Sequence, residues 1–459
     1  MSNLAVTEIV TEETPGKLSL KERLGYAVGD LSTNIIWTAI TTFLTFFYTD
    51  IVGISAGVVG TIFLLTRFLD GVVDIGIGVL VDRTNSKHGK ARPWIKWMAV
   101  PFGLSVMVLF TAPDLGNTGS IVYAAVTYFI VTVIYSAINI PYAALNSLMT
   151  QDSYQRSLLN ITRMTLSLLG GVMISIITMP VVNAFGGGKS GWALTFGIIG
   201  ILSPILYWIT YRTSKERVKP VVVKKAIPLR KGLRALGRNK YWLIVLVFNV
   251  FLFLSTGVSS ALNIYYAQYI LHNPALVGSL SLAGLVPLII GIVLSAPLIK
   301  RIGKRNTILA GAILSAVGSV IVFIDPTNFM LIMVSTVIKT LGVAPAVATG
   351  SALLADTVEY GEWKTGARTE GLIFSGASLA PKIGSGIGGA MVGWVLSAGG
   401  YVGGMETQPD SAISAIKVLY IVVPLILVIL QIILMFFYSL EKKLPAIIKE
   451  LDQIAGKEN

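Results

Sequence analysis

Three charged residues stand within an otherwise apolar run near the start of the chain. The run reads TRFLDGVVDIGIG, and its charges are Arg67, Asp70 and Asp74. Side chains three and four residues apart lie on one face of a helix, so these three would point the same way. Two carboxylates one turn apart can hold a small cation, or burial and mutual repulsion can make one of them take up a proton. Arg67 can neutralise one carboxylate.

The composition places these charges inside a membrane. Of the 459 residues, 54% are hydrophobic and 13% are charged, whereas soluble domains average about 25% charged residues. Such a chain cannot cover itself with polar surface, so it is predicted to be an integral membrane protein. Ionisable residues inside apolar spans are costly and point to function, although an inert structural ion pair is the alternative.

Runs of about 20 apolar residues are needed to cross a bilayer as helices. Strands of a β-barrel would instead give short alternating segments, which this sequence lacks. The predicted fold class is therefore all-α. Twelve spans are expected, near residues 24–50, 54–81, 94–113, 119–148, 158–185, 191–211, 241–270, 276–300, 307–325, 328–354, 370–398 and 414–438.

Lysine and arginine indicate the orientation, because they collect in every second loop. The same side holds the basic segment between Arg212 and Lys240 and the pair Lys442 and Lys443. We expect this side, with both termini, to be the cytoplasmic side of the cell membrane. The net charge of +13 is explained by this bias and by attraction to anionic membrane lipid, and it requires no nucleic acid.

Several classes of enzyme chemistry are disfavoured by what the sequence lacks. It contains no cysteine, and its only histidines are His88 and His272, so thiol nucleophiles and a structural metal site are not expected. No GxxxxGK[ST] phosphate loop is present. A membrane-embedded enzyme is the rival class, but no nucleophile–base pair supports it. We expect a protein without cofactor that is driven by an ion gradient.

The chain repeats itself at the level of six spans. GVLVDRTNSKHGKARPWI follows the second span, and APLIKRIGKRNTILAG follows the eighth. Parallel six-helix repeats with a binding site between them are typical of major-facilitator carriers. The predicted organisation is a tail (1–20), an N-terminal half (21–211), a central loop (212–240), a C-terminal half (241–440) and a second tail (441–459).

Three longer motifs carry a resemblance to a known family. They are RFLDGVVDIGIGVLVDRTNSKHGKARPW, NIPYAAL and LLADTVEYGEWKTGARTEGLIFSGASLAPKIGSGIGG. On these motifs the chain resembles the glycoside–pentoside–hexuronide:cation symporters of the major facilitator superfamily, which carry melibiose, glucuronides and xylosides. The resemblance implies twelve helices in two halves and import of a sugar with a cation by alternating access. A lysolipid carrier of the same superfamily is the alternative.

The resemblance places the cation site in the second span. Asp70 and Asp74 fall on the family's paired cation-site carboxylates, with Ser136 beside them. The melibiose carrier has an amide directly before the second aspartate, where this chain has Val73. Sodium needs around half a dozen oxygen ligands, by analogy with other hard cations, so this loss favours H+ as the coupling ion. Na+ is the alternative.

The resemblance also suggests a sugar site. Asn34 and Asn139 replace two sugar-binding aspartates of the melibiose carrier, which favours β-xylosides or glucuronides over α-galactosides. A neutral pentoside is slightly preferred, because Arg67 and Lys382 would already face aspartates. The role of Lys339 is left open. The expected sugar-binding residues are Asn34, Asp30, Asn139, Lys382, Arg67, Tyr26 and Tyr142.

Charged residues at the cytoplasmic ends of the spans are expected to join the two halves. Each exposed pair contributes roughly 0–1 kcal/mol, but several together can bias a two-state equilibrium. The residues predicted for this interdomain gate are Asp82, Arg83, Arg156, Asp356, Glu359 and Arg368.

Overall fold

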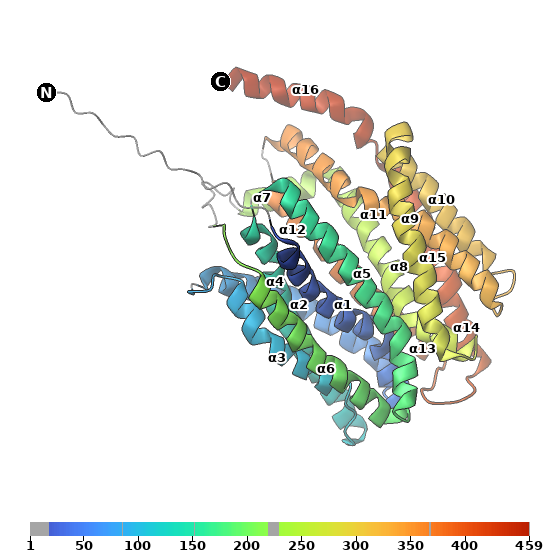
Figure 1. Cartoon of the computed structure of the whole chain (residues 1–459). Coiled ribbons are helices and arrows are strands. Elements are labelled where there is room, and N and C mark those ends of the chain that lie inside the picture. Colours follow the sequence, from blue (N-terminus) through green and yellow to red (C-terminus); the bar gives the residue numbers. More distant parts are fainter. Residues whose placement is uncertain (1–17, 85, 151, 219–228, 367–368, 459) are drawn as a thin grey trace.

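A computed structural model describes residues 18–84, 86–150, 152–218, 229–366 and 369–458. The first half is a bundle of long helices that pack side by side (Figure 1). Its first helix continues into the π-helical turn η1 (Phe47–Ile51). The helices are α1 (Leu20–Phe46), α2 (Ala56–Arg83), α3 (Arg92–Leu109), α4 (Gly116–Met149), α5 (Ser153–Ala184) and α6 (Gly188–Thr213).

The second half forms a matching bundle, in which two spans are broken. The eleventh predicted span consists of α12 (Glu370–Ala377) and α13 (Leu379–Ala398), and the twelfth of α14 (Asp410–Lys417), η3 (Val418–Val422) and α15 (Val423–Phe437). The unbroken helices of this half are α8 (Lys240–Tyr269), α9 (Val277–Ile302), α10 (Lys304–Ile321) and α11 (Phe329–Thr365). A 3₁₀ turn, η2 (Pro274–Leu276), lies between α8 and α9.

Two further helices were not predicted. The short helix α7 (Leu229–Arg238) precedes α8, and α16 (Leu440–Glu458) crosses the end of the bundle after the last span (Figure 1). Helix α16 is attached by its apolar side, since Ile447 is buried against the C-terminal half. Both helices carry several lysines or arginines, so neither contains the long apolar run that predicts a membrane span.

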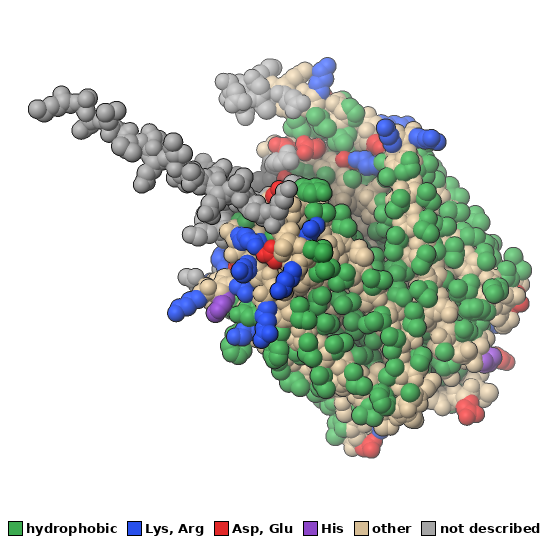
Figure 2. Space-filling model, in the orientation of Figure 1, with side chains coloured by type: hydrophobic (Ala, Val, Ile, Leu, Met, Phe, Trp, Pro, Cys, Tyr) green, Lys and Arg blue, Asp and Glu red, His purple; other side chains and the backbone are tan. Residues whose placement is uncertain are grey.

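The flank of the bundle has the character of a membrane protein. Seven helical stretches of the described chain are long and apolar enough to cross a membrane. Large apolar side chains such as Phe68, Ile75 and Val293 are among the most exposed, and Figure 2 shows hydrophobic side chains spread over this flank. The predicted all-α membrane class is confirmed.

The two halves meet at the end opposite the basic loops. There Asp50 accepts hydrogen bonds from the hydroxyls of Tyr269 and Tyr401, with Tyr401 Oη 2.7 and 2.8 Å from the two carboxylate oxygens. Thr49 and Tyr265 join their hydroxyls at 2.8 Å. Asp50 and Thr49 belong to the N-terminal half and the tyrosines to the C-terminal half, so this end of the bundle is closed.

Glycines allow the close approach of α2 and α13 at that end. A Cβ atom on Gly393 would lie 2.3 Å from the carbonyl oxygen of Ala56, and one on Gly60 would lie 2.6 Å from that of Ala390. Both distances are below any contact that real side chains make. The two backbones therefore touch directly, as is common where membrane helices cross at small residues.

Candidate functional site

The charges of the second span lie in the interior of the molecule. Asp70 on α2 is only 3% exposed. Its Oδ1 accepts a hydrogen bond from Ser136 Oγ on α4 at 3.2 Å, and its Oδ2 lies 3.5 Å from the guanidinium of Arg67. The helical spacing thus places Arg67 and Asp70 together as predicted, and α4 contributes the hydroxyl.

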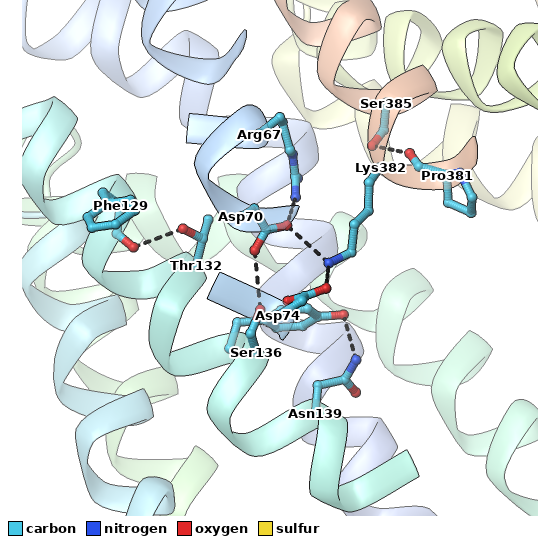
Figure 3. Close-up of polar contacts among 11 residues, drawn as sticks. Arg67, Asp70, Asp74, Phe129, Thr132, Ser136, Asn139, Pro381, Lys382 and Ser385 are labelled. Carbon is cyan, nitrogen blue, oxygen red and sulfur yellow. Dashed lines mark hydrogen bonds and ion pairs between the residues drawn. The ribbon is translucent and has the colours of Figure 1, made fainter. Parts of the chain in front are cut away.

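Lys382 reaches this cluster from the other half of the molecule. Figure 3 shows its side chain extending from α13 to the two aspartates of α2. Its ammonium lies 3.3 Å from Asp70 Oδ2 and is hydrogen-bonded to Asp74 Oδ2. Gly386, one turn further along α13, leaves room for Arg67, since a Cβ there would lie 2.6 Å from Arg67 Cγ. One ion cluster therefore joins the two halves.

The cluster is balanced in charge. Two cations, Arg67 and Lys382, face two carboxylates, Asp70 and Asp74. Arg67 is also held over the ring of Trp37 at 4.6 Å, a cation–π contact that keeps it in place. The second oxygen of Asp74, Oδ1, is buried and accepts no hydrogen bond from the residues that the structure describes. That oxygen is the free acceptor of the cluster, where a proton or another cation can bind.

Two amides predicted to contact sugar lie on either side of this region. Asn139 on α4 donates from Nδ2 to the Tyr135 hydroxyl at 3.3 Å, one turn beyond Ser136. Asn34 on α1 donates from Nδ2 to the carbonyl oxygen of Asp30 at 3.2 Å. Neither Oδ1 atom accepts a hydrogen bond from the residues that the structure describes. Asn34 lines the central cavity described below.

Asp30 has a partner that sequence reasoning missed. Its Oδ2 lies 4.0 Å from Nε of Arg163 on α5. Arg163 is a charged residue within the predicted fifth span, so the cost of a charge at that depth was the signal that could have identified it. The pair joins α1 and α5 within the N-terminal half.

Tyr26 and Tyr142 lie away from the cavity. Their rings stack at 4.7 Å with an angle of 8°, and each hydroxyl donates to the backbone carbonyl of the other, at 3.4 and 2.8 Å. Both side chains are fully buried. This reciprocal contact joins α1 to α4 and covers the ring faces that a sugar would need. Of the seven residues predicted to bind sugar, Asn34 alone is among the described residues that line the cavity.

A cavity of about 400 Å³ lies between the two halves. This volume falls within the range of small-molecule sites. Its wall is rich in hydroxyl and amide groups, and helix α8 alone presents a polar stripe at helical spacing. In the sequence, the signal for this stripe is a set of serines, a threonine and an asparagine at helical spacing inside an apolar span. The polar residues of the wall include Asn34, Thr38, Ser167, Ser175, Ser255, Thr256, Ser259, Ser260, Asn263, Ser281, Thr336, Thr340 and Gln431.

The residues predicted to form a gate between the halves have other contacts in this conformation. Asp356 forms an ion pair with Lys304, which joins α10 to α11 within the C-terminal half. Arg156 donates to the carbonyl oxygen of Thr150, close by in its own half. Each of these two contacts lies within one half, and neither joins one half to the other.

The remaining gate candidates are placed as follows. Arg83 is exposed at the C-terminal end of α2, and Glu359 lies on α11. The side chain of Asp82 and the whole of Arg368 lie outside the described residues.

Comparison with known sequences identifies relatives along nearly the whole chain. The MFS/sugar transport protein family matches residues 25–442. The isoprimeverose transporter of Lactiplantibacillus pentosus is 37% identical, over 95% of this chain and 92% of its own. The putative glycoside/cation symporter YagG of Escherichia coli (strain K12) is 33% identical, over 95% of both chains. The glucuronide carrier protein homolog of the same organism is 31% identical, over 95% and 96%.

Solved structures resemble the fold at lower identity. A bacterial homologue of the human lysosomal transporter Spinster, in an inward-facing and unoccupied conformation, has a TM-score of 0.65 at 15% identity, over 93% of this chain and 96% of its own. The nucleoside transporter NupG has a TM-score of 0.62 at 14% identity, over 91% and 100%. These likenesses concern the fold alone, and they confirm the predicted transporter architecture.

Proposed function

This chain belongs to the MFS/sugar transport protein family, and from that membership we propose that it imports a glycoside together with a cation by alternating access. The observation that carries the proposal is the position of Lys382. This residue of one half bridges two carboxylates of the other half, and a polar cavity of substrate size lies between the same two halves.

The cavity is the proposed sugar site. Hydroxyl and amide side chains donate and accept hydrogen bonds in the same way as sugar hydroxyls do. Leucines and valines, among them Leu252, Leu285 and Val343, also line the cavity, so a lysolipid carrier stays the alternative that the uptake experiment below must exclude. The relatives include carriers named for isoprimeverose and glucuronide, so we propose a substrate of the pentoside or glucuronide type.

Asp70 and Asp74 are the proposed cation site. In the structure the ammonium of Lys382 contacts one oxygen of each carboxylate. A proton taken up by Asp74 would remove one of these charges and weaken the hold on Lys382. Because Lys382 belongs to the other half, binding of the coupling ion would then loosen a contact between the halves.

We propose H+ as the coupling ion. A proton needs one carboxylate oxygen, and Asp74 Oδ1 has no partner among the described residues. A sodium ion would need several more oxygens, and the neighbouring Val73 supplies no side-chain oxygen. Na+ symport is the second candidate, because two carboxylates and the Ser136 hydroxyl are hard ligands.

The proposed orientation follows from the charges. Lys and Arg gather at the end where α1 begins and α16 lies (Figure 2), and the positive-inside rule assigns this end to the cytoplasm. Anionic lipid of the cell membrane would favour the same arrangement. The end closed by Asp50 and Tyr401 then faces outward.

Uptake into membrane vesicles tests the proposal. The vesicles are offered labelled β-xylosides, β-glucuronides, α-galactosides and a lysophospholipid, under an imposed proton or sodium gradient. We expect accumulation of a xyloside or glucuronide, and weak uptake of α-galactosides because an amide, Asn34, stands in the cavity wall where a carboxylate was expected for α-galactosides. Accumulation of the lysophospholipid alone would contradict the proposal, and efficient melibiose uptake would contradict the substrate class.

A further inference from the structure

Lys339 presents a positive charge to the central cavity. It lies on α11, and its Nζ is 4.9 Å from the centre of the Tyr420 ring on η3. Both residues line the cavity, together with the neutral polar side chains of Thr336, Thr340 and Gln431. No aspartate or glutamate is among the residues that line this cavity, and the structure records no ion pair of Lys339 with a described carboxylate.

The other charged residues of the interior have ion-pair or hydrogen-bond partners. The cluster on α2 and α13 sums to zero, with two cations and two carboxylates. The second pair is Asp30 with Arg163. Asp50, at the closed end, is held by hydroxyl and backbone N–H donors that do not line the cavity. Among the described residues that line the cavity, Lys339 is the one charged residue, and no described carboxylate forms an ion pair with it.

An unpaired ammonium makes closure of the cavity costly. When the halves close over a substrate, water leaves, and a buried cation without a counter-ion loses its hydration without compensation. The negative face of the Tyr420 ring stabilises the ammonium and offsets part of this cost. A neutral sugar can satisfy the hydroxyls of the wall, but it brings no negative charge to Lys339.

We propose that Lys339 binds an anionic group of the substrate, so that the cavity selects acidic glycosides of the uronide class over neutral ones. The inference rests on the proposed function and narrows its substrate. The carboxylate of the sugar would supply the counter-ion that the protein lacks, while the serines and threonines would hold the ring hydroxyls. The sequence-based preference for a neutral pentoside considered only Arg67 and Lys382, which do have aspartate partners in the structure.

Three β-glycosides with the same aglycone separate charge from shape. A xyloside carries hydrogen at C5, a glucoside carries a hydroxymethyl group there, and a glucuronide carries a carboxylate. We expect the wild-type protein to take up the glucuronide with a kcat/KM about tenfold or more above that of the glucoside, the scale of one charge-assisted hydrogen bond. The wild-type comparison needs no variant and so does not depend on the folding of one.

Variants at Lys339 then assign the preference to this residue. Lys339→Gln is expected to lower the glucuronide-to-glucoside ratio by about tenfold or more, whereas Lys339→Arg keeps the charge and should retain the ratio. Lys300→Gln is the matched control, because Lys300 is exposed at the end of α9 and lies outside the cavity wall. It removes the same charge and should leave the ratio at the wild-type value.

The outcomes separate this inference from the function on which it rests. A wild-type protein that prefers the xyloside or glucoside, or a Lys339→Gln variant with an unchanged ratio, overturns the role of Lys339 but leaves glycoside transport in place. Uptake of none of the three glycosides overturns both.

Discussion

The ammonium of Lys382 is hydrogen-bonded to the carboxylate of Asp74, although 308 positions separate the two residues in the sequence. One belongs to α13 and the other to α2, so the contact joins the two halves of the molecule. Protonation of Asp74 would remove one charge of this contact, and this is how the proposed ion binding would act on the relative position of the halves.

The first prediction concerns coupling at Asp74. Asp74→Asn removes the carboxylate that would take up the coupling ion, so accumulation of glycoside against a gradient should be lost, while exchange of sugar down its gradient should persist. Energised uptake and counterflow in the same vesicles measure the two activities. Asp114→Asn is the control, since Asp114 is exposed outside the bundle. Full accumulation by Asp74→Asn would exclude this residue from the coupling site.

The second prediction concerns the ion itself. Addition of a transported glycoside to a lightly buffered suspension of cells should make the medium more alkaline, because protons enter with the sugar. The signal should be absent in Asp74→Asn and should not require sodium. An uptake that rises steeply with sodium at constant pH, without alkalinisation, would instead identify Asp70 and Asp74 as a sodium site.

The third prediction concerns the closed end. Burial raises the pKa of Tyr401, so its phenol keeps its proton at neutral pH and donates to the carboxylate of Asp50. Tyr401→Phe removes these hydrogen bonds between the halves, each worth about 1.5–3 kcal/mol when the acceptor is charged. We expect the population opened at this end to increase by roughly tenfold or more.

The absence of native cysteine makes this change measurable. A single cysteine is introduced at Ser259, on the cavity wall, and labelled with a membrane-impermeant maleimide added outside. This cysteine should react faster in the Tyr401→Phe variant than in the wild-type background. Tyr123→Phe is the matched control, because the Tyr123 hydroxyl donates to Val108 within one half, at 2.8 Å. Equal labelling rates in Tyr401→Phe and the wild-type protein would show that this contact does not hold the end closed.

The fourth prediction tests the backbone contact between α2 and α13. In Gly393→Ala the new methyl group would lie 2.3 Å from the carbonyl oxygen of Ala56, so the helices must move apart. The closed end should open more often, and the same labelling assay should report it. Gly197→Ala is the control on α6, where a Cβ meets nothing within 4 Å. Unchanged labelling in Gly393→Ala would mean that the helices adjust without opening.

The candidate site was predicted in part. The placement of Arg67, Asp70 and Asp74 on one helix face follows from the period of the helix, which is a local property. The contact of Lys382 with Asp70 and Asp74 was suggested by the resemblance to a family, and no local pattern indicates it. The stacking of Tyr26 on Tyr142 was not foreseen, because it depends on how α1 and α4 pack.

What the sequence determined by itself was the membrane class, the approximate limits of the spans and the charged face of α2. These features depend on hydrophobicity and helical spacing over short stretches of chain. Tertiary structure decided which polar residues share a cavity, that Lys339 faces it without a carboxylate beside it, and that Asp50 meets Tyr401. Each of these relations depends on the packing of helices far apart in the sequence, and many sequences with the same local pattern could pack their helices differently.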